Sequence, residues 1–370
     1  MKTFIKILKG LLIVVAFFIL GYYMVKYFVP SVGKAPNKEE MAESPYYNKG
    51  KFVNSVHTTS AEFTQVPRIL RNYFKRDVET NPTEDYVFTE NNKQENDSIL
   101  QINWLGHAAV LFYKNGKYVL ADPMLGQRAS PFNFMGPERF SAPPISAEDL
   151  PELEAVVISH DHYDHLDYET IKKITAKTKY FYVPTGVKAS LEYWGVPTKK
   201  IKEFSWWDSH SEDGITITAT PARHFSGRLF SQNNTFWASW VIEMDGDNIY
   251  FGGDTGIFDG FKEIDEKFGP FDLALMPIGA YNEAWHDIHM DPKEAIDAFQ
   301  QMRAKKLFPI HWGTFDLALH SWYEPILDLE NQAVEKEIPL LSIPQGKWFS
   351  LDAESENGWW KQYSEEISSE

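Results

Sequence analysis

The stretch Ser159-His160-Asp161-His162-Tyr163-Asp164-His165-Leu166-Asp167 predicts both the fold class of this chain and the position of its chemistry. It directly follows the apolar run Ala155-Val156-Val157-Ile158. A short run rich in β-branched residues predicts a buried strand, and α/β folds build their sites beyond the carboxyl ends of strands. Imidazole and carboxylate groups are ligands that zinc and similar metals prefer. The sequence therefore predicts a metal site at the exit of a buried strand.

Composition limits the classes of protein that this chain can be. Its 370 residues are 43% apolar and 15% aromatic, which is typical of a globular protein with one large domain or two smaller ones. The net charge of -16 disfavours a nucleic-acid partner. The sequence contains no cysteine, so it has neither disulfides nor thiolate ligands, and this leaves the cellular compartment open.

The N-terminus carries a candidate membrane segment. Residues 10–25 are uncharged and strongly apolar, and the run reaches the roughly 20 residues of a membrane span if Lys26 snorkels to the interface. No small-x-small cleavage pattern follows, which favours an uncleaved signal anchor over a removed signal peptide or a buried soluble helix. Lysines before the run place that end in the cytoplasm and the body on the periplasmic or extracytoplasmic side. Lys34 and Lys38 beyond it weaken this asymmetry.

The chain divides into four predicted segments. Residues 1–29 are the anchor, and residues 30–50, rich in Pro, Gly, Lys, Glu, Ser and Asn, are expected to form a tether. Residues 51–350 hold the metal motif. Residues 351–370 form an acidic tail, in which Trp359-Trp360 can dock on the body.

Apolar runs alternate with turns and helical patterns within residues 51–350, which predicts an α/β fold. Asp167 caps a predicted helix over 168–175, and Asp291-Pro292 begins one that runs to about residue 303. The predicted strands cover residues 99–104, 108–113, 118–121, 155–158, 180–183, 215–220, 237–243, 248–251, 273–276 and 307–310.

Three other predicted strands also end at a residue that can bind a metal. These residues are His224, Asp254 and His311. Taken singly, each has an ordinary explanation, as a hydrogen-bonded surface histidine or a turn aspartate. Four segments with the same pattern favour a dinuclear site. The predicted ligands are His160, His162, Asp164, His165, His224, Asp254 and His311.

Spacing suggests how these seven ligands divide between two metals. His160 and His162 alternate along an extended segment, so their side chains point the same way and can bind one metal with His224. Asp164 and His165 lie on the turn beyond and can bind the second metal with His311. Asp254 offers two carboxylate oxygens and is the expected bridge.

The order His-x-His-x-Asp-His, followed by the three later ligands, resembles the metallo-β-lactamase fold superfamily. This resemblance implies that residues 51–350 form a hydrolase domain of the α/β class. Its expected architecture is a four-layer αβ/βα sandwich with a two-metal site. Finer motifs over about residues 51–347 are similar to the N-acyl-phosphatidylethanolamine-hydrolysing phospholipase D family. They include Trp104-Leu105-Gly106-His107-Ala108, Asp122-Pro123, Thr220-Pro221-Ala222-Arg223-His224, Gly253-Asp254-Thr255-Gly256, Pro277-Ile278-Gly279-Ala280-Tyr281, His289-Met290-Asp291-Pro292 and His311-Trp312-Gly313-Thr314-Phe315.

The closer resemblance implies a phospholipase D reaction with two Zn²⁺ ions, and Mn or Fe are alternative metals. A hydroxide activated by the two metals would attack phosphorus, giving phosphatidic acid and an N-acylethanolamine. Tyr163 and His289 match family positions that contact the substrate. His289 would donate to the phosphate or to the leaving alkoxide, and Asp164 would orient the nucleophile. His286 is a second candidate for the histidine, because residues 281–289 depart from the family pattern.

His107 and Asp122 are expected to orient metal-bound histidines; a buried structural hydrogen bond between them is the alternative. The expected partners are a phospholipid substrate and a bilayer, without nucleic acid, and the sequence is compatible with a homodimer. Two other functions remain open. One is a metallo-hydrolase of the same fold that acts on a lactone, an amide or a cyclic phosphodiester. The other is a non-catalytic, membrane-anchored metal-binding protein.

Overall fold

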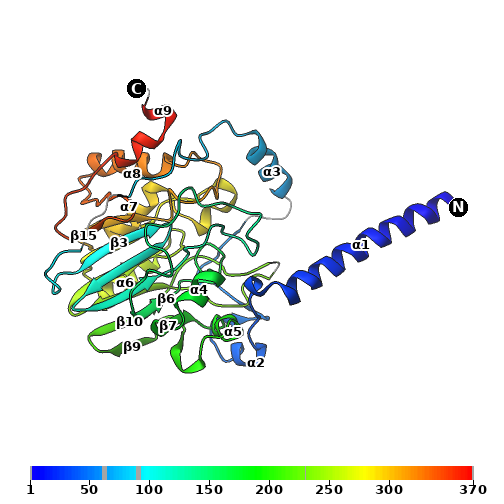
Figure 1. Cartoon of the computed structure of the whole chain (residues 1–370), viewed down its shortest axis with the longest axis horizontal. Coiled ribbons are helices and arrows are strands. Elements are labelled where there is room, and N and C mark those ends of the chain that lie inside the picture. Colours follow the sequence, from blue (N-terminus) through cyan, green and yellow to red (C-terminus); the bar gives the residue numbers. More distant parts are fainter. Residues whose placement is uncertain (1, 61–64, 89–92, 230, 369–370) are drawn as a thin grey trace.

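Two β-sheets make up the centre of the protein in a computed structural model, which describes residues 2–60, 65–88, 93–229 and 231–368 (Figure 1). The larger sheet holds, in spatial order, β15 (Trp348–Ser350), β3 (Gln101–Gly106), β4 (Ala109–Lys114), β5 (Lys117–Ala121), β6 (Leu153–Val157), β7 (Thr178–Pro184) and β8 (Ile201–Phe204). The smaller sheet holds β14 (Leu307–Ile310), β13 (Leu273–Pro277), β12 (Asp247–Phe251), β11 (Ser239–Met244), β10 (Ile215–Thr220) and β9 (Ser209–Glu212). A short ribbon pairs β1 (Tyr47–Asn48) with β2 (Lys51–Phe52).

Helices flank the two sheets, and one further helix, α1, forms the N-terminus. The α-helices are α1 (Lys2–Phe28), α2 (Lys38–Met41), α3 (Val66–Lys75), α4 (Tyr168–Ile174), α5 (Lys188–Tyr193), α6 (Gly260–Phe268), α7 (Pro292–Gln301), α8 (Glu324–Glu335) and α9 (Glu365–Ser368). Short 3₁₀ turns are η1 (Pro30–Val32), η3 (Thr198–Lys200), η4 (Glu283–Ile288) and η5 (Trp359–Tyr363).

The alternation of side chains along β4 shows how the layers stack. Val110 and Phe112 enter the core that the two sheets share, whereas Ala109 and Leu111 enter a second cluster formed with α4 and α5. Successive residues of a strand point to opposite faces, so a strand apolar on both faces lies between two packed layers. Helices α6, α7 and α8 pack into the first cluster from the side of the smaller sheet. The predicted four-layer αβ/βα sandwich is confirmed.

Parallel pairing brings several strand ends to one edge. The pairs β5–β6, β6–β7 and β7–β8 are parallel in the larger sheet, as are β12–β13 and β13–β14 in the smaller. The carboxyl ends of parallel strands meet at the same edge of a sheet, where α/β proteins build their sites. Residues that follow β6, β12 and β14 therefore meet where the two sheets adjoin.

Helix α1 projects away from the body in Figure 1. Its stretch Lys6–Phe28 is long and apolar enough to cross a membrane, and none of that stretch is buried in the protein. An apolar helix of this length that is not buried in the body is a candidate membrane anchor, as the sequence predicts.

Residues 30–50 differ from the expected tether. The Trp194 indole donates to the Pro30 carbonyl at 2.8 Å, and the Arg228 guanidinium donates to the Ser31 carbonyl at 2.5 Å. Val32 is buried. These contacts use backbone carbonyls, which every residue has, so composition could not reveal them.

The acidic tail also packs on the body instead of extending into solvent. Trp360 and Tyr363 are buried, and the Ser364 hydroxyl donates to Glu79 at 2.8 Å. The docking expected for the two tryptophans therefore also includes Tyr363 and Ser364.

Candidate metal centre

The Asp254 carboxylate, which follows β12, lies at the middle of a cluster of histidines from three other strand exits. Its Oδ2 atom lies 3.2 Å from His165 Nε2, 3.5 Å from His224 Nε2 and 3.8 Å from His160 Nε2. Its Oδ1 atom lies 3.0 Å from His311 Nε2. Asp254 therefore contacts histidines of both predicted ligand groups, as a bridging ligand must.

The first group comprises His160, His162, His224 and Asp254. One ligand atom from each lies within 4.8 Å of all the others. His160 Nε2 and His162 Nδ1 are 2.8 Å apart, and His224 Nε2 is 3.4 Å from the same His162 nitrogen. This convergence is the geometry that one metal ion requires.

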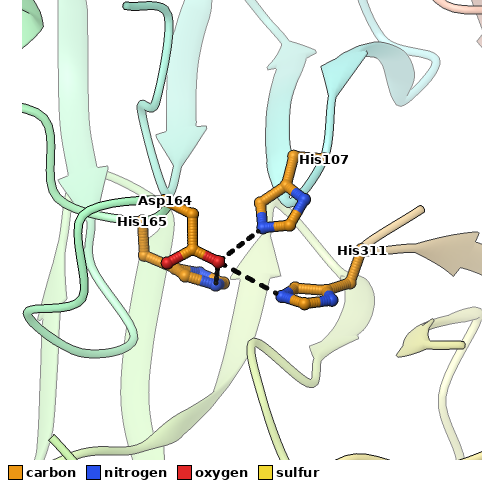
Figure 2. Close-up of side chains that lie close together, drawn as sticks. All are labelled: His107, Asp164, His165 and His311. Carbon is orange, nitrogen blue, oxygen red and sulfur yellow. Dashed lines mark hydrogen bonds and ion pairs between the residues drawn. The ribbon is translucent and has the colours of Figure 1, made fainter. Parts of the chain in front are cut away.

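The second group comprises Asp164, His165, His311 and also His107 (Figure 2). Asp164 Oδ2 lies 3.0 Å from His107 Nε2 and 3.5 Å from Nε2 of both His165 and His311. His107 was expected to orient a metal-bound histidine, and it does not pair with Asp122. It contacts the Asp164 carboxylate directly instead, as the dashed line in Figure 2 shows.

Hydrogen bonds to the Nδ1 nitrogens, which point away from Asp254, fix the orientation of three histidine rings. Asp122 Oδ2 lies 2.7 Å from His165 Nδ1, and the Ser159 hydroxyl lies 2.9 Å from His160 Nδ1. His224 Nδ1 donates to the Ile288 carbonyl at 3.0 Å. Such partners hold the tautomer and direct the other ring nitrogen toward a metal. The expected role of Asp122 matches this contact, whereas the parts played by Ser159 and Ile288 were not predicted.

The backbone at three of these positions is in the left-handed region. His107, Asp122 and His311 follow β3, β5 and β14 with φ of 54°, 38° and 64°. For residues other than glycine this conformation costs about 1–3 kcal/mol and persists only where neighbours enforce it. Here the His311 amide donates to the His107 carbonyl at 3.0 Å, and the His107 amide donates to Thr314 Oγ1 at 2.6 Å. The motifs around His107 and His311 thus support each other.

Gly253 is required beside Asp254. Its φ of 56° is left-handed, and a Cβ atom there would lie 2.5 Å from the Cβ of Ser159. Real Cβ contacts are never this short, so any larger residue would push β12 away from residues 159–167, the metal-ligand loop. Glycine at this position lets Asp254 reach the histidines.

Electrostatics differ between the two groups. Burial holds the pKa of His160 and His224 well below the usual range. Burial also opposes protonation of His311, but the facing Asp254 carboxylate and Asp164 raise its pKa to about 9. Against the effect of burial, the histidines around Asp254 hold the pKa of its carboxyl well below the usual value. The carboxylates are therefore ionised, and the first group of histidines is neutral, which are the forms that bind metals.

Unpaired buried atoms test whether metal ions fit here. His165 Nε2, His311 Nε2 and Asp254 Oδ1 are buried and make no aligned hydrogen bond among the described residues, although both histidine nitrogens lie 3.0–3.2 Å from the Asp254 carboxylate. An unsatisfied buried polar atom costs about 1–3 kcal/mol, and three of them face one another. Coordination to a divalent cation would satisfy all three. The imidazole and carboxylate donors fit Zn, Mn or Fe.

A cavity of about 300 Å³ lies over the cluster. Its lining combines polar cluster residues with an apolar wall, and comprises Ser60, His162, Asp164, Phe225, Gln232, Asp254, Ala280, Trp285, Ile288, His289, His311 and Leu317. A substrate in this cavity would contact both the candidate metal ligands and apolar side chains.

The sequence matches the family described as the β-lactamase superfamily domain over residues 117–312. The chain belongs to this superfamily. It is 42% identical over 311 residues to an uncharacterized protein of Mycobacterium tuberculosis, covering 82% of this chain and 83% of that protein. It is 40% identical over 241 residues to N-acyl-phosphatidylethanolamine-hydrolyzing phospholipase D 1 of Caenorhabditis elegans, covering 61% of this chain and 67% of that protein.

A solved structure supports the same fold. Igni18, a metallo hydrolase from Ignicoccus hospitalis, superposes with a TM-score of 0.52 at 22% identity, covering 69% of this chain and 99% of that one. This likeness supports the fold, whereas the family match, the phospholipase D relative and the histidine–aspartate cluster identify the chain as a metal-dependent hydrolase of the superfamily.

The two candidate histidines of residues 281–289 lie in different places. His289 lines the cavity, with its ring centre 5.1 Å from that of His224 and 5.2 Å from that of His311. Its Nδ1 atom is buried without a hydrogen-bond partner in the described part of the chain. The His286 side chain is 57% exposed and pairs with Glu294 at 3.2 Å. The structure therefore places His289, and not His286, at the site of this superfamily member.

Tyr163 and Arg228 form a pair behind the cluster. The Arg228 guanidinium lies 4.0 Å from the centre of the Tyr163 ring, and Tyr163 is not among the cavity-lining residues. Arg228 donates to the carbonyls of Asp161 and Leu166 at 2.7 and 2.9 Å, and so closes the metal-ligand loop at both ends. The sequence offered no signal for Arg228, because its partners are again backbone carbonyls.

Asp161 belongs to the loop but not to the cluster. Its Oδ1 atom accepts the Gly227 amide at 2.7 Å, which links the metal-ligand loop to the segment that follows His224. The sequence interpretation left Asp161 outside the ligand set, and the structure gives it a contact that holds the loop instead.

Proposed function

We propose that this hydrolase is a phosphodiesterase of phospholipase D type that converts N-acyl-phosphatidylethanolamine-like phospholipids to phosphatidic acid and N-acylethanolamine. The observation that carries the proposal is the cavity over the cluster. It holds His289 and candidate metal ligands together with the apolar side chains of Phe225, Trp285 and Leu317. A phosphodiester with an acyl chain presents the same two halves, one polar and one apolar. The name of the Caenorhabditis elegans relative and the motifs around the cluster give the same reaction class.

The proposal includes two zinc ions held by the seven predicted ligands. Bound there, they would supply Lewis acidity and a water of lowered pKa for attack on phosphorus. Water adds to phosphorus, the bond from phosphorus to the ethanolamine oxygen breaks, and one proton goes to that leaving oxygen. Asp254 and Asp164 keep the charge of the cluster negative enough to hold divalent cations.

His289 has a specific part in this reaction. Burial lowers the pKa of its imidazole to about 4, so at neutral pH the ring is uncharged and carries a single N–H. A neutral imidazole can donate one hydrogen bond to a phosphate oxygen without adding a buried positive charge to the cluster. We assign it to binding and orienting the phosphate, while Trp285 and Phe225 offer apolar contacts to the rest of the substrate in the same cavity.

We also propose that the protein binds a bilayer and that its body lies on the periplasmic or extracytoplasmic side. Helix α1 would hold the site at the membrane surface, which raises the effective concentration of a lipid substrate.

The experiment uses the full chain, purified with its membrane helix, loaded with zinc and mixed with vesicles that contain N-acyl-phosphatidylethanolamine. Reaction in ¹⁸O-water should release N-acylethanolamine and place the label in phosphatidic acid, because attack on phosphorus puts the oxygen of water on that product. Asp254→Asn is the matched control, since it removes charge from the cluster without changing size. Turnover of lactones, amides or cyclic phosphodiesters in the absence of any lipid cleavage would overturn the proposal.

A further inference from the structure

Helix α3 is a ten-residue helix without a packed face. None of its residues is buried, and Leu70, Tyr73 and Phe74 are 51%, 40% and 80% exposed. Short helices in proteins owe their stability mainly to packing of an apolar face. A cluster of exposed aromatic and aliphatic side chains indicates an interaction surface. Nothing in the described part of the chain buries the apolar side chains of α3.

The charge of α3 is opposite to that of the chain. It contains Arg68, Arg71 and Lys75 and no acidic residue, whereas the whole chain has a net charge of -16. No carboxylate of the described residues pairs with these three cations. Basic residues beside exposed aromatic side chains are the pattern of helices that lie on anionic membrane surfaces.

Contacts at its C-terminal end join α3 to a segment that lines the active-site cavity. Arg76 pairs with Asp316 and donates to the Ala318 carbonyl, and the Tyr73 hydroxyl donates to Asp316 at 3.2 Å. Leu317, between these two acceptors, lines the cavity. Ser60, upstream of α3, lines the same cavity. The chain around α3 thus reaches the cavity rim from both directions.

The same side of the molecule carries the anchor. Helices α1 and α3 both lie on the right of Figure 1, away from α8. The Ser31 hydroxyl, at the base of α1, donates to the Pro131 carbonyl at 2.5 Å. The loop that contains Pro131 exposes Phe134 and Met135 by 73% and 52%. A bilayer that α1 spans would therefore face this loop and α3.

We propose that α3 lies on the bilayer surface, with Leu70, Tyr73 and Phe74 in the interface and Arg68, Arg71 and Lys75 on lipid phosphates. The loop tip Phe134-Met135 completes this contact, which we call the α3 patch. The patch sets the cavity mouth against the membrane, and lipid enters the cavity past Leu317. The entry step rests on the proposed function, whereas the contact of α3 with the membrane does not.

The test uses the absence of cysteine from the chain. Phe74→Cys in the full chain carries the only thiol and can be labelled with an environment-sensitive fluorophore. In vesicles of phosphatidylcholine with phosphatidylglycerol, its emission should rise, and lipids with a shallow nitroxide should quench it. The matched control is Val334→Cys, whose side chain is 74% exposed and which belongs to α8, a helix that lies away from α1 in Figure 1. A Phe74 label as hydrated and as weakly quenched as the Val334 label would overturn the proposal.

Two further variants test the chemistry of the contact. Arg68→Gln with Arg71→Gln should weaken the response of the Phe74 label to phosphatidylglycerol, while quenching in its absence stays unchanged. Leu70→Ser with Phe74→Ser should raise the KM for vesicle lipid about tenfold and leave kcat for a short-chain, water-soluble diester unchanged. An equal loss of kcat on both substrates would contradict a membrane role. If the Phe74 label is quenched but no lipid is cleaved, the proposed function fails and the α3 patch stands.

Discussion

The two ligand groups contain similar donors but are supported by different partners. In the first group the far sides of His160 and His224 meet neutral acceptors, the Ser159 hydroxyl and the Ile288 carbonyl. In the second group His165 meets the Asp122 carboxylate and Asp164 meets His107. A carboxylate behind a histidine makes the ring more basic than a carbonyl does. Equal sets of ligands therefore do not imply equal metal sites, and the second should depend more on charge.

The largest expected effect comes from the ligand that the groups share. Asp254→Ala should lower turnover by more than about 100-fold, the upper limit for loss of a supporting residue. Metal content, measured by elemental analysis, should fall at both positions because Asp254 contacts histidines of each group. Retention of two metals would show that the groups bind independently.

Replacing the carboxylate behind His165 should affect the second group more than the first, which Asp122 reaches only through the Ser159 hydroxyl. Asp122→Asn should weaken binding of the second metal by about 10- to 100-fold and that of the first by less. Competition with a chelator measures both affinities. Asp161→Asn is the control, because Asp161 lies in the same loop and its side chain accepts the Gly227 amide instead of facing a ligand histidine. Equal weakening of both metals by Asp122→Asn would remove the distinction between the groups.

The number of protons released when a metal binds should also differ between the two groups, with a smaller effect on affinity. His311 has a pKa of about 9 without metal, so its ring is protonated at pH 7 and must lose that proton to bind a cation. Between pH 6 and 8, affinity at the second group should rise about tenfold per pH unit for each proton displaced. His160 and His224 are already neutral there, so affinity at the first group should stay flat. Calorimetry in buffers of different ionisation enthalpy counts the protons released, and none at either group would refute this difference.

The smallest effect is expected at Tyr163, which stands in the sequence between His162 of the first group and Asp164 of the second. Its hydroxyl is buried and has no hydrogen-bond partner among the described residues, so Tyr163→Phe should change the free energy of unfolding by less than about 0.5 kcal/mol. Thermal unfolding and turnover are the measurements. Tyr163→Ala, which removes the ring from the Arg228 guanidinium, should cost more. A large loss of turnover in the phenylalanine variant would support direct contact with the substrate.

Sequence periodicity was sufficient for the strands that carry the cluster. Strands β10 and β14 begin and end where the apolar runs predict. The capping box between Asp291 and Glu294, which begins α7, has the geometry that its residues predict. These elements owe their position to local chemistry and to burial on both faces, which a single sequence expresses directly.

Elements of low apolar content were missed. Strand β9, Ser209-His210-Ser211-Glu212, pairs with β10 through backbone hydrogen bonds at the edge of the smaller sheet, so its side chains carry little signal. The same reason applies within the site. Ile288 acts through its carbonyl, and the contact between His107 and Asp164 joins segments that no local pattern connects.

Arg228 has a consequence for how the protein can be shortened. Its guanidinium is buried and divides its donors between the Ser31 carbonyl at the base of α1 and two carbonyls of the metal-ligand loop. Cutting the chain after Val32 would remove the first acceptor and leave a charged donor buried, at about 1–3 kcal/mol or more. The cut would loosen the clamp on the loop that carries His162 and Asp164. A soluble form should therefore begin at or before Pro30, because the foot of the anchor is also part of the support of the metal centre.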